Sequence, residues 1–350
     1  MADINIRIVG QAGRLTLTRP EALNALTHEM CHAIMATLDD WAENDQVRLV
    51  VIDAEGDKAF CAGGDLHELY ETGRAENYVY GRQFWTDEYR LNARIAEYPK
   101  PFVALMQGYT LGGGVGLSCH GSQRIVCETS QISMPECGIG LVPDVGGSLL
   151  LARAPGRLGE FLGTTATRMG PDDAIYAGFA DTFIPQVAWP DLISELEQSG
   201  STKVIEQMAA PPPEGTLSAR QSEIDAVFGG ADLRAILNAM DYAPSAFNAD
   251  TRARMARNSP LAMACTIEMI HRLRGGRTTI RDALELEYRF TYRAMEQGDF
   301  LEGVRAAVID KDRAPAWQHT LEAPPMPAVT QMLMPLGRDK LRFETQEETT

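Results

Sequence analysis

The chain has 350 residues, in which 48 aspartates and glutamates outnumber 32 lysines and arginines and give a formal net charge of −16. An acid excess of this size argues against nucleic acid as a partner, because phosphate affinity depends on clustered basic side chains. The sequence contains no apolar run near the roughly 20 residues that a membrane helix needs. The N-terminus lacks the basic start and apolar stretch of a signal peptide. We therefore expect a cytoplasmic globular protein without a membrane partner.

The first half of the chain alternates strand and helix patterns. Residues 4–19 alternate loosely around Gln11-Ala12-Gly13 and predict a hairpin. Residues 27–44 carry apolar side chains at helical spacing and predict a helix capped by Thr27. Further patterns predict a helix after the glycine pair in 60–66, a helix within 76–98, and strands over 48–53, 102–106, 124–127 and 131–134. Buried strands that alternate with helices predict an α/β core.

Strand patterns fade in the second half of the chain, and helical patterns dominate. Residues 158–183 predict two helical pieces, and the prolines at 211–213 predict a linker or an exposed loop. Helix starts are predicted at Ser259-Pro260, a cap followed by a first-turn proline, and at Thr279, which forms a capping-box pattern with Asp282. We expect a core over 1–205, a helical region over 206–325 and a partly disordered tail over 326–350.

The cysteines and histidines give little sign of a metal or disulfide framework. The six cysteines form no C-x-x-C pair, which fits thiols in a reducing cytoplasm. The string HEMCH at 28–32 matches a zinc motif by letters, with His28 and His32 as ligands and Glu29 as base. Because no third ligand is evident nearby, we interpret it as an exposed helix start and expect no metal.

Two glycine-rich junctions between a strand and a helix are the strongest chemical signal, Gly63-Gly64 and Gly112-Gly113-Gly114. Glycine lets a backbone N–H approach a ligand that a Cβ would keep away, and the amides at a helix start are unpaired. Two such amides that converge on one point would form an oxyanion hole. The alternative is that these glycines only permit tight turns or close packing.

A nucleophile elbow is nearly present at Ser118, but His120 replaces its final glycine. Ser118 and His120 are two residues apart, and such neighbours do not face each other on a helix. We therefore expect Ser118 to be a packing residue and keep a serine hydrolase as an alternative. No dinucleotide or P-loop glycine motif occurs in the sequence.

Two acids stand in the otherwise apolar stretch MPECGIGLVPDVGGS at 134–148. Glu136 follows a predicted strand, and Asp144 precedes a glycine pair. A carboxyl in an apolar pocket is desolvated, so its pKa rises toward values useful in base catalysis. The alternatives are that Asp144 caps a helix beginning near Val145 and that Glu136 is a surface acid.

Four motifs resemble the crotonase (enoyl-CoA hydratase/isomerase) superfamily in order and spacing. They are RPEALNAL at 19–26, FCAGGDL at 60–66, GYTLGGGVGLS at 108–118 and MPECGIGLVPDVGG at 134–147. Within the superfamily the sequence is most similar to the 3-hydroxyisobutyryl-CoA hydrolases. The features of this subgroup are GGGVGLSCHG, the acid of PDVGG, LELEYRF at 284–290 and FLEGVRAAVIDKDRAPAW at 300–317.

The resemblance implies a crotonase fold of stacked ββα turns with an extended helical C-terminal region. It places the oxyanion-hole amides on Gly64 and Gly113. It suggests that Leu23 and Ala25 contact the CoA moiety, with Arg19 as a weaker candidate. No metal or cofactor is implied, since CoA is part of the substrate. The C-terminal helices, longer than in a simple hydratase, either support a homo-oligomer or fold back over the active site.

The resemblance also indicates the reaction. Hydratases of the family use two glutamates, of which the first position holds Gly116 here and the second holds Glu136. With Asp144 where hydratases typically have glycine, this set fits hydrolysis of a short 3-hydroxyacyl-CoA. The expected substrate is 3-hydroxyisobutyryl-CoA, from valine catabolism.

The resemblance assigns a role to each acid. Glu136 would activate a water or attack the carbonyl, and Asp144 would bind the substrate's 3-hydroxyl or position the water. Glu88 matches a substrate-contacting acid, although it could also belong to a solvated helix face. The alternatives are hydration or isomerisation of another acyl-CoA and a catalytically silent CoA-binding protein.

Overall fold

The computed structural model describes residues 3–323 and 325–343. The chain forms two compact units, each built from separate segments. Unit 1 comprises Met1–Gly64, Leu91–Ser133 and Arg168–Ser218, and unit 2 comprises Asp65–Arg90, Met134–Thr167 and Ala219–Thr350. The division at residue 205 remains a prediction. Of the expected tail, residues 344–350 lie outside the described part, and the rest includes α16 (Met326–Met332).

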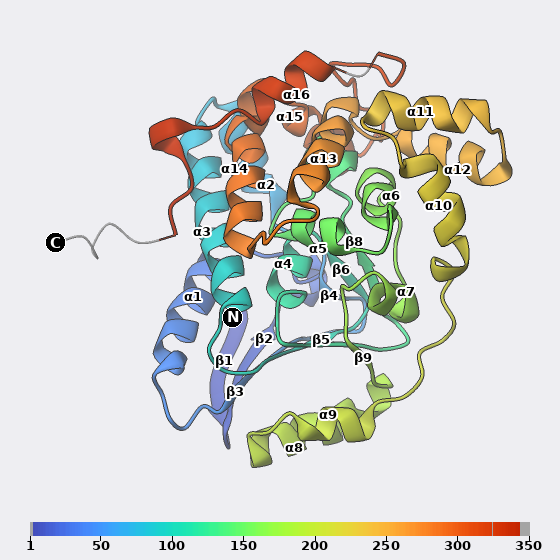
Figure 1. Cartoon of the computed structure of the whole chain (residues 1–350). Helices are drawn as coiled ribbons and strands as arrows, with labels where there is room; N and C mark the ends of the chain where they lie inside the picture. The colour runs from blue at the N-terminus through green and yellow to red at the C-terminus, as the bar shows by residue number, and fades with distance from the viewer. Residues whose placement is uncertain (1–2, 324, 344–350) are drawn as a thin grey trace. The chain divides into compact units, whose positions relative to one another are not determined.

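All the described strands belong to unit 1, where they form two sheets (Figure 1). The larger sheet holds, in order, β1 (Ile4–Val9), β2 (Ala12–Leu17), β3 (Leu49–Ala54), β5 (Phe102–Met106), β7 (Gln123–Val126) and β9 (Thr182–Phe183). The smaller sheet holds β4 (Ala59–Cys61), β6 (Tyr109–Leu111) and β8 (Gln131–Ser133). Only β1 and β2 pair antiparallel among these strands. In turn, β3, β5 and β7 are each followed by a strand of the smaller sheet, which confirms the α/β class with stacked ββα turns.

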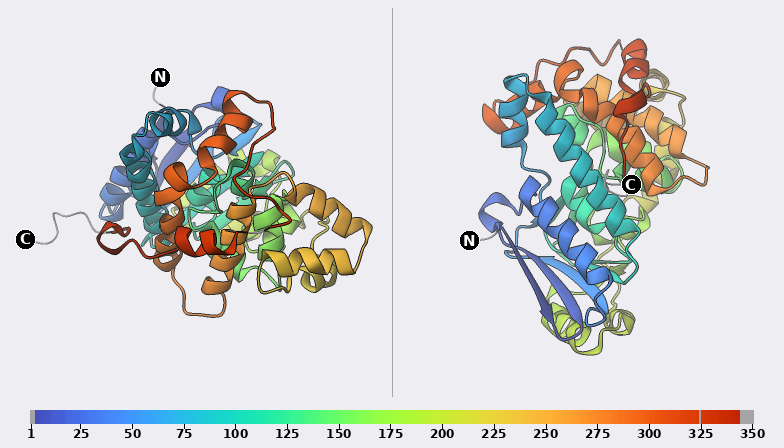
Figure 2. Two further views of the ribbon diagram at one scale, coloured as in Figure 1. Left: turned by 90° about the horizontal axis from the view of Figure 1, so that it is seen from above. Right: turned by 90° about the vertical axis from the view of Figure 1, so that its left-hand side faces the viewer.

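The helices of unit 1 cover the larger sheet. They are α1 (His28–Ala42), the second part of α3 (Tyr78–Ala96), α4 (Gly113–Ser118), α7 (Pro171–Tyr176), α8 (Trp189–Ser199) and α9 (Lys203–Met208). Helices α8 and α9 share one buried apolar cluster with the strands, through side chains such as Leu192 and Ile205. Helix α1 runs alongside β1 and β2 (Figure 2, right), and a Cβ on Gly13 of β2 would lie 2.4 Å from the Trp41 ring of α1. Buried on both faces, the parallel strands are therefore continuous apolar runs such as LVVI of β3.

Two details of the larger sheet differ from the sequence prediction, and β4 and β6 of the smaller sheet were not predicted. The hairpin turns at Gly10-Gln11 rather than at residues 11–13, because Gly10 adopts φ +57° and Ala12 already pairs with Val9. Strand β9 was not predicted. It has only two residues, Thr182 and Phe183, and pairs with the end of β7, so no alternating pattern could reveal it.

Unit 2 is helical, as the sequence predicts for the second half of the chain. It holds α2 (Leu66–Arg74), the first part of α3, α5 (Gly147–Arg153), α6 (Leu158–Thr165), α10 (Gln221–Phe228), α11 (Leu233–Tyr242), α12 (Ala246–Met255), α13 (Pro260–Leu273), α14 (Ile280–Gln297), α15 (Phe300–Val304) and α16. Helices α5, α6 and α13 pack against one another. Ser259 caps α13, and Thr279 and Asp282 form the predicted capping box of α14. None of the described helices combines the length and apolar character of a membrane span.

Candidate active site

In unit 1, the loop at residues 19–26 lies against the first glycine pair. Leu23 and Asn24 adopt the left-handed region, with φ of 52° and 54°. The Asn24 amide stabilises this turn by donating to the carbonyls of Glu55 and Ala59 at 3.0 and 2.9 Å. The N–H of Leu26 donates to the Gly63 carbonyl at 2.9 Å. The predicted CoA-contacting residues therefore lie next to the predicted oxyanion glycine Gly64.

The second glycine segment packs onto the first within the same unit. Gly113 is the first residue of α4, so its N–H has no acceptor within the helix. A Cβ on Gly114 would lie 2.2 Å from the Cys61 carbonyl oxygen, so only glycine permits this approach of α4 to β4. Among the described residues, the N–H groups of Gly64 and Gly113 form no hydrogen bond. The structure thus brings together the two segments that the sequence predicts for an oxyanion hole.

A pocket of about 290 Å³ opens beside the loop at 19–26 in unit 1. It is lined by Pro20, Asn24, Glu55, Gly56, Asp57, Lys58 and Ala59. Lys58 is the cationic residue of this lining, and no sequence pattern had singled it out. Arg19 instead supports the loop, since its guanidinium donates to the Ala25 carbonyl at 2.7 Å and pairs with Asp3 at 3.5 Å.

The three predicted acids are all buried in unit 2. Glu88 on α3 is 3% exposed, Glu136 is 5% exposed and Asp144 is 4% exposed. Burial therefore rules out the solvated-face interpretation of Glu88 and the surface interpretation of Glu136. The Glu136 Oε2 atom is buried and has no hydrogen-bond partner in the part of the chain that the structure describes.

Asp144 does not cap a helix. Helix α5 begins at Gly147, after the cap residue Gly146, with no side-chain cap. The Asp144 carboxylate instead accepts a hydrogen bond from the buried Tyr89 hydroxyl, at 2.7 Å. Tyr89 follows Glu88 on α3. No sequence pattern indicates this contact, because Tyr89 and Asp144 are 55 residues apart.

The acids of unit 2 are held in a weakly solvated, negatively charged environment. Burial raises the pKa of Asp144 to about 7, against the opposing hydrogen bond from Tyr89. Burial, and then the charge of Asp144, raise the pKa of Glu136 well above its ordinary value. The same two causes raise the pKa of Glu88. Carboxyls with raised pKa values are suited to proton transfer near neutral pH.

Comparison with known proteins decides the family. A family model described as enoyl-CoA hydratase/isomerase matches residues 12–333. The chain belongs to the enoyl-CoA hydratase/isomerase family. The resemblance inferred from the glycine and acid motifs is therefore confirmed.

Relatives within the family carry more than one name. The mitochondrial 3-hydroxyisobutyryl-CoA hydrolase of Danio rerio is 38% identical over 91% of this chain and 85% of its own. The Homo sapiens protein of the same name is 34% identical over 88% and 82%. A crystal structure named as an enoyl-CoA hydratase from Rhodobacter sphaeroides 2.4.1 is 54% identical with a TM-score of 0.92, covering 97% of this chain and 100% of that one. One named as a carnitinyl-CoA dehydratase from Mycobacterium thermoresistibile is 35% identical with a TM-score of 0.93, covering 99% and 100%.

The other candidate nucleophiles of this family member are packing groups. The Ser118 hydroxyl donates to the Gly114 carbonyl of its own helix at 2.6 Å, inside a fully buried segment. Burial raises the pKa of the Cys119 thiol to about 11 and that of Cys137 to about 12, so neither forms a thiolate at neutral pH. The two histidines of the HEMCH string, His28 and His32, lie on α1 with their ring centroids 4.5 Å apart.

Proposed function

We propose that this chain hydrolyses 3-hydroxyisobutyryl-CoA to 3-hydroxyisobutyrate and CoA, a step of valine catabolism. The observation that carries the proposal is the buried Glu136 carboxyl, whose Oε2 has no hydrogen-bond partner among the described residues and whose pKa is raised. Such an oxygen is available to a water or a thioester carbonyl. The names of the Danio rerio and Homo sapiens relatives support this substrate. Thiol release from the purified enzyme and this thioester tests the proposal.

We assign the roles as follows. The N–H groups of Gly64 and Gly113 donate to the thioester oxygen as it becomes an oxyanion, an effect worth about 3 kcal/mol for each donor. Glu136 carries out the central step, and Asp144 hydrogen-bonds the substrate's 3-hydroxyl or positions the water. Glu88 contacts the substrate. The support lies in the two amides, which form no hydrogen bond within residues 3–323 and 325–343, and in the burial of the acids.

Two routes through Glu136 give the same products. As a general base, Glu136 takes a proton from water, the water oxygen adds to the carbonyl carbon, and the departing CoA thiolate receives that proton. As a nucleophile, Glu136 adds to the carbonyl and expels CoA thiolate, and water then cleaves the resulting anhydride. A single turnover in H₂¹⁸O separates them. The label appears directly in the acid product by the first route and partly in Glu136 by the second.

Hydration of an enoyl-CoA is the second candidate, favoured by the name of the Rhodobacter sphaeroides structure. Position 116, where hydratases of the family have a glutamate, is a buried glycine of α4. A glycine offers no carboxyl for the second proton transfer, so hydration should be slow. Loss of enoyl absorbance with crotonyl-CoA measures it directly.

The pH dependence follows from the raised pKa of Glu136. Glu136 must be ionised to act, so we expect kcat/KM to fall as the pH drops through a value above the ordinary carboxyl range. Because the charge of Asp144 raises this pKa, Asp144→Asn should shift the acidic limb of the residual activity to lower pH. Glu285→Gln, which changes a partly exposed acid paired with Arg289, is the control and should not move the limb. A limb that stays fixed in Asp144→Asn would contradict this coupling.

The pocket beside residues 19–26 supports the proposal that Leu23, Ala25 and the neighbouring loop contact the CoA moiety. Lys58 in its lining would face the anionic groups of CoA. We therefore expect Lys58→Ala to raise KM by about tenfold, the loss of one charge-assisted contact, with kcat nearly unchanged. Lys203→Ala on α9 is the matched control and should leave KM as it is. If the two variants had equal KM values, Lys58 would not contact CoA and the prediction would be wrong.

Three further expectations stand as proposals. We expect no metal or cofactor, so chelators should leave turnover unchanged. All six cysteines are buried thiols, which supports a reducing compartment such as the cytoplasm, whereas the vertebrate relatives are named as mitochondrial. Cell fractionation decides between these locations. The third proposal is a homo-oligomer, which light scattering on the purified protein tests.

A further inference from the structure

Glu287 on α14 lies within the LELEYRF motif, but no role was assigned to it from the sequence. Its side chain is fully buried, and both of its oxygens accept hydrogen bonds from one short stretch of chain. Oε2 accepts from the Gly146 N–H at 2.8 Å, and Oε1 accepts from the Ser148 N–H at 3.1 Å. The Ser148 hydroxyl makes a further bond to Oε1. Glu287 therefore ties α14 to the turn that follows Asp144.

That turn is held in an unfavourable conformation. Val145 has φ +52°, a region that β-branched residues avoid, and Gly146 has φ +80°. Such backbone strain is unfavourable and persists only where the surroundings impose it. The Gly147 N–H donates to the Asp144 carbonyl at 2.6 Å and closes the turn. The bonds to Glu287 at Gly146 and Ser148 fix it from the other side.

Asp144 is thus held at two points. Its carboxylate accepts from the Tyr89 hydroxyl on α3, and its backbone enters the turn that Glu287 anchors. Burial raises the pKa of Glu287 to about 8, against the hydrogen bonds from Ser148 and Gly146. No ion pair to Glu287 is found in the described residues of unit 2. A buried carboxyl without a cation destabilises a fold, so its presence calls for a role other than stability.

We infer that Glu287 is a positioning residue, which holds the Asp144–Ser148 turn in the strained conformation that orients the Asp144 carboxylate toward the substrate. The inference rests on the proposed function, since it assigns Glu287 an effect through Asp144. Ser148 belongs to the same device because its hydroxyl and its N–H both bond to Glu287. A displacement of about 1 Å in a reacting group can cost roughly a hundredfold in rate.

The test is a double-mutant cycle between Glu287 and Asp144, read by thiol release from 3-hydroxyisobutyryl-CoA. Glu287→Gln keeps the shape but replaces one acceptor oxygen by an amide donor, so one backbone N–H of the turn loses its bond. We expect kcat to fall by about tenfold to a hundredfold. In the Asp144→Asn background the same change should cost almost nothing, because both act through one carboxylate. Ser148→Ala, which removes only the hydroxyl bond, should give a smaller loss and serves as the milder variant if Glu287→Gln folds poorly.

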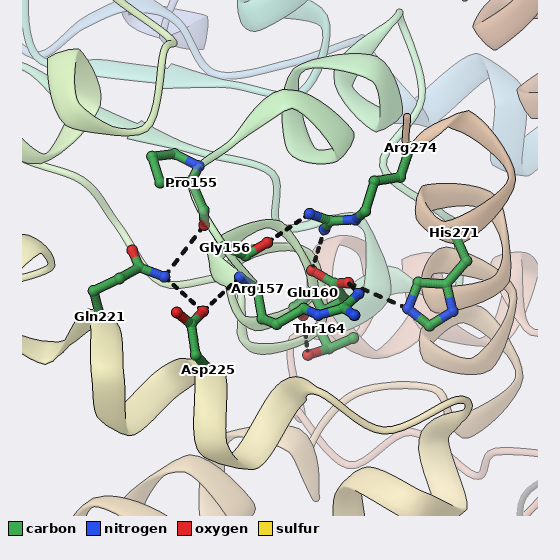
Figure 3. Close-up of polar contacts among 9 residues, drawn as sticks. All are labelled: Pro155, Gly156, Arg157, Glu160, Thr164, Gln221, Asp225, His271 and Arg274. Atoms are coloured by element: carbon green, nitrogen blue, oxygen red, sulfur yellow. Dashed lines mark hydrogen bonds and ion pairs between the residues drawn. The ribbon is translucent and has the colours of Figure 1, made fainter. Parts of the chain in front are cut away.

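Glu160 on α6 offers the matched control (Figure 3). It is also a fully buried carboxyl, bonded to Arg157 at 3.0 Å, to His271 at 3.2 Å and to Arg274 at 2.6 Å. Burial alone would raise the pKa of Glu160, but the His271 hydrogen bond and the Arg274 charge hold it below its usual value. Glu160→Gln should therefore lower the stability of the fold, which a lower melting temperature would show. At a temperature where it is folded, it should leave kcat unchanged.

The outcomes separate the two proposals. If Asp144→Asn itself retains full turnover, the role proposed for Asp144 is wrong and the inference falls with it. If Asp144→Asn is impaired but the losses from Glu287→Gln and Asp144→Asn multiply, Glu287 does not act through Asp144 and the inference alone is wrong. A loss in Glu160→Gln as large as that in Glu287→Gln would show that both act only through stability. Near-identical kcat values for Asp144→Asn and the double variant would support the inference.

Discussion

Replacing Glu136 with glutamine should lower kcat for CoA release from 3-hydroxyisobutyryl-CoA by about a thousandfold. Glutamine is nearly isosteric but neither accepts a proton from water nor attacks a carbonyl. The Glu136 side chain is buried, and its Oε2 atom has no hydrogen-bond partner among the described residues. This oxygen is therefore available to a water or to the thioester carbonyl. Substrate affinity should change little, because the loss concerns the transition state. Stopped-flow or steady-state thiol release measures kcat, and calorimetric titration with substrate measures the affinity.

Ser118→Ala is the control for this experiment. The Ser118 hydroxyl bonds within its own helix, so the variant should retain its activity. Full turnover in Glu136→Gln together with a loss in Ser118→Ala would reverse the assignment and point to a serine hydrolase.

Replacing Asp144 with asparagine should impair turnover yet stabilise the folded protein at alkaline pH. The pKa of Asp144 rises from about 3.9 in the unfolded chain to about 7 in the folded state because of burial. The folded state therefore binds the proton more tightly, so stability is full below the unfolded pKa and is lost as the pH rises through the folded pKa. The difference of about three pH units corresponds to about 4 kcal/mol. Asparagine stays neutral and still accepts the Tyr89 hydrogen bond.

Urea unfolding at a series of pH values from 5 to 9 tests this second prediction, with the pH range chosen around the folded and unfolded pKa values. The difference in free energy of unfolding between Asp144→Asn and the unmodified protein should grow with pH and level off above the folded pKa. Glu160→Gln should behave oppositely and lose stability, since the pKa of Glu160 is lowered in the fold. If Asp144→Asn were less stable than the unmodified protein at every pH, the ionised Asp144 carboxylate would not destabilise the folded state, and the prediction would be wrong.

The fold could be predicted from the sequence wherever a local pattern carried the information. The run LVVI of β3, the Thr27 cap of α1 and the Thr279 capping box all match the structure, because each depends on neighbouring residues. The two-residue β9 could not be predicted, since only its pairing with β7, far earlier in the chain, defines it. The turn at Gly10-Gln11 was misplaced because it depends on the register of β1 with β2, which the loose alternation does not determine.

The candidate site divides in the same way. Glu136, Asp144 and the glycine segments follow from motifs, and burial of the acids agrees with the apolar context in which they stand. Tyr89 and Glu287 were missed because each contact joins a helix residue to the Asp144–Ser148 turn, more than 50 residues away in the chain. An acid at a buried position of an amphipathic helix, such as Glu287 within LELEYRF, is the signal that could have found the second.

The central claim is that the enzyme directs water to the thioester carbonyl and not to a carbon–carbon double bond. One measurement decides it: initial rates of thiol release from 3-hydroxyisobutyryl-CoA beside loss of enoyl absorbance with crotonyl-CoA, on the same enzyme preparation. Because Gly116 offers no second carboxyl, we predict rapid thiol release and slow hydration, with thiol release abolished in Glu136→Gln. Rapid hydration of crotonyl-CoA without thiol release from 3-hydroxyisobutyryl-CoA would contradict the proposal.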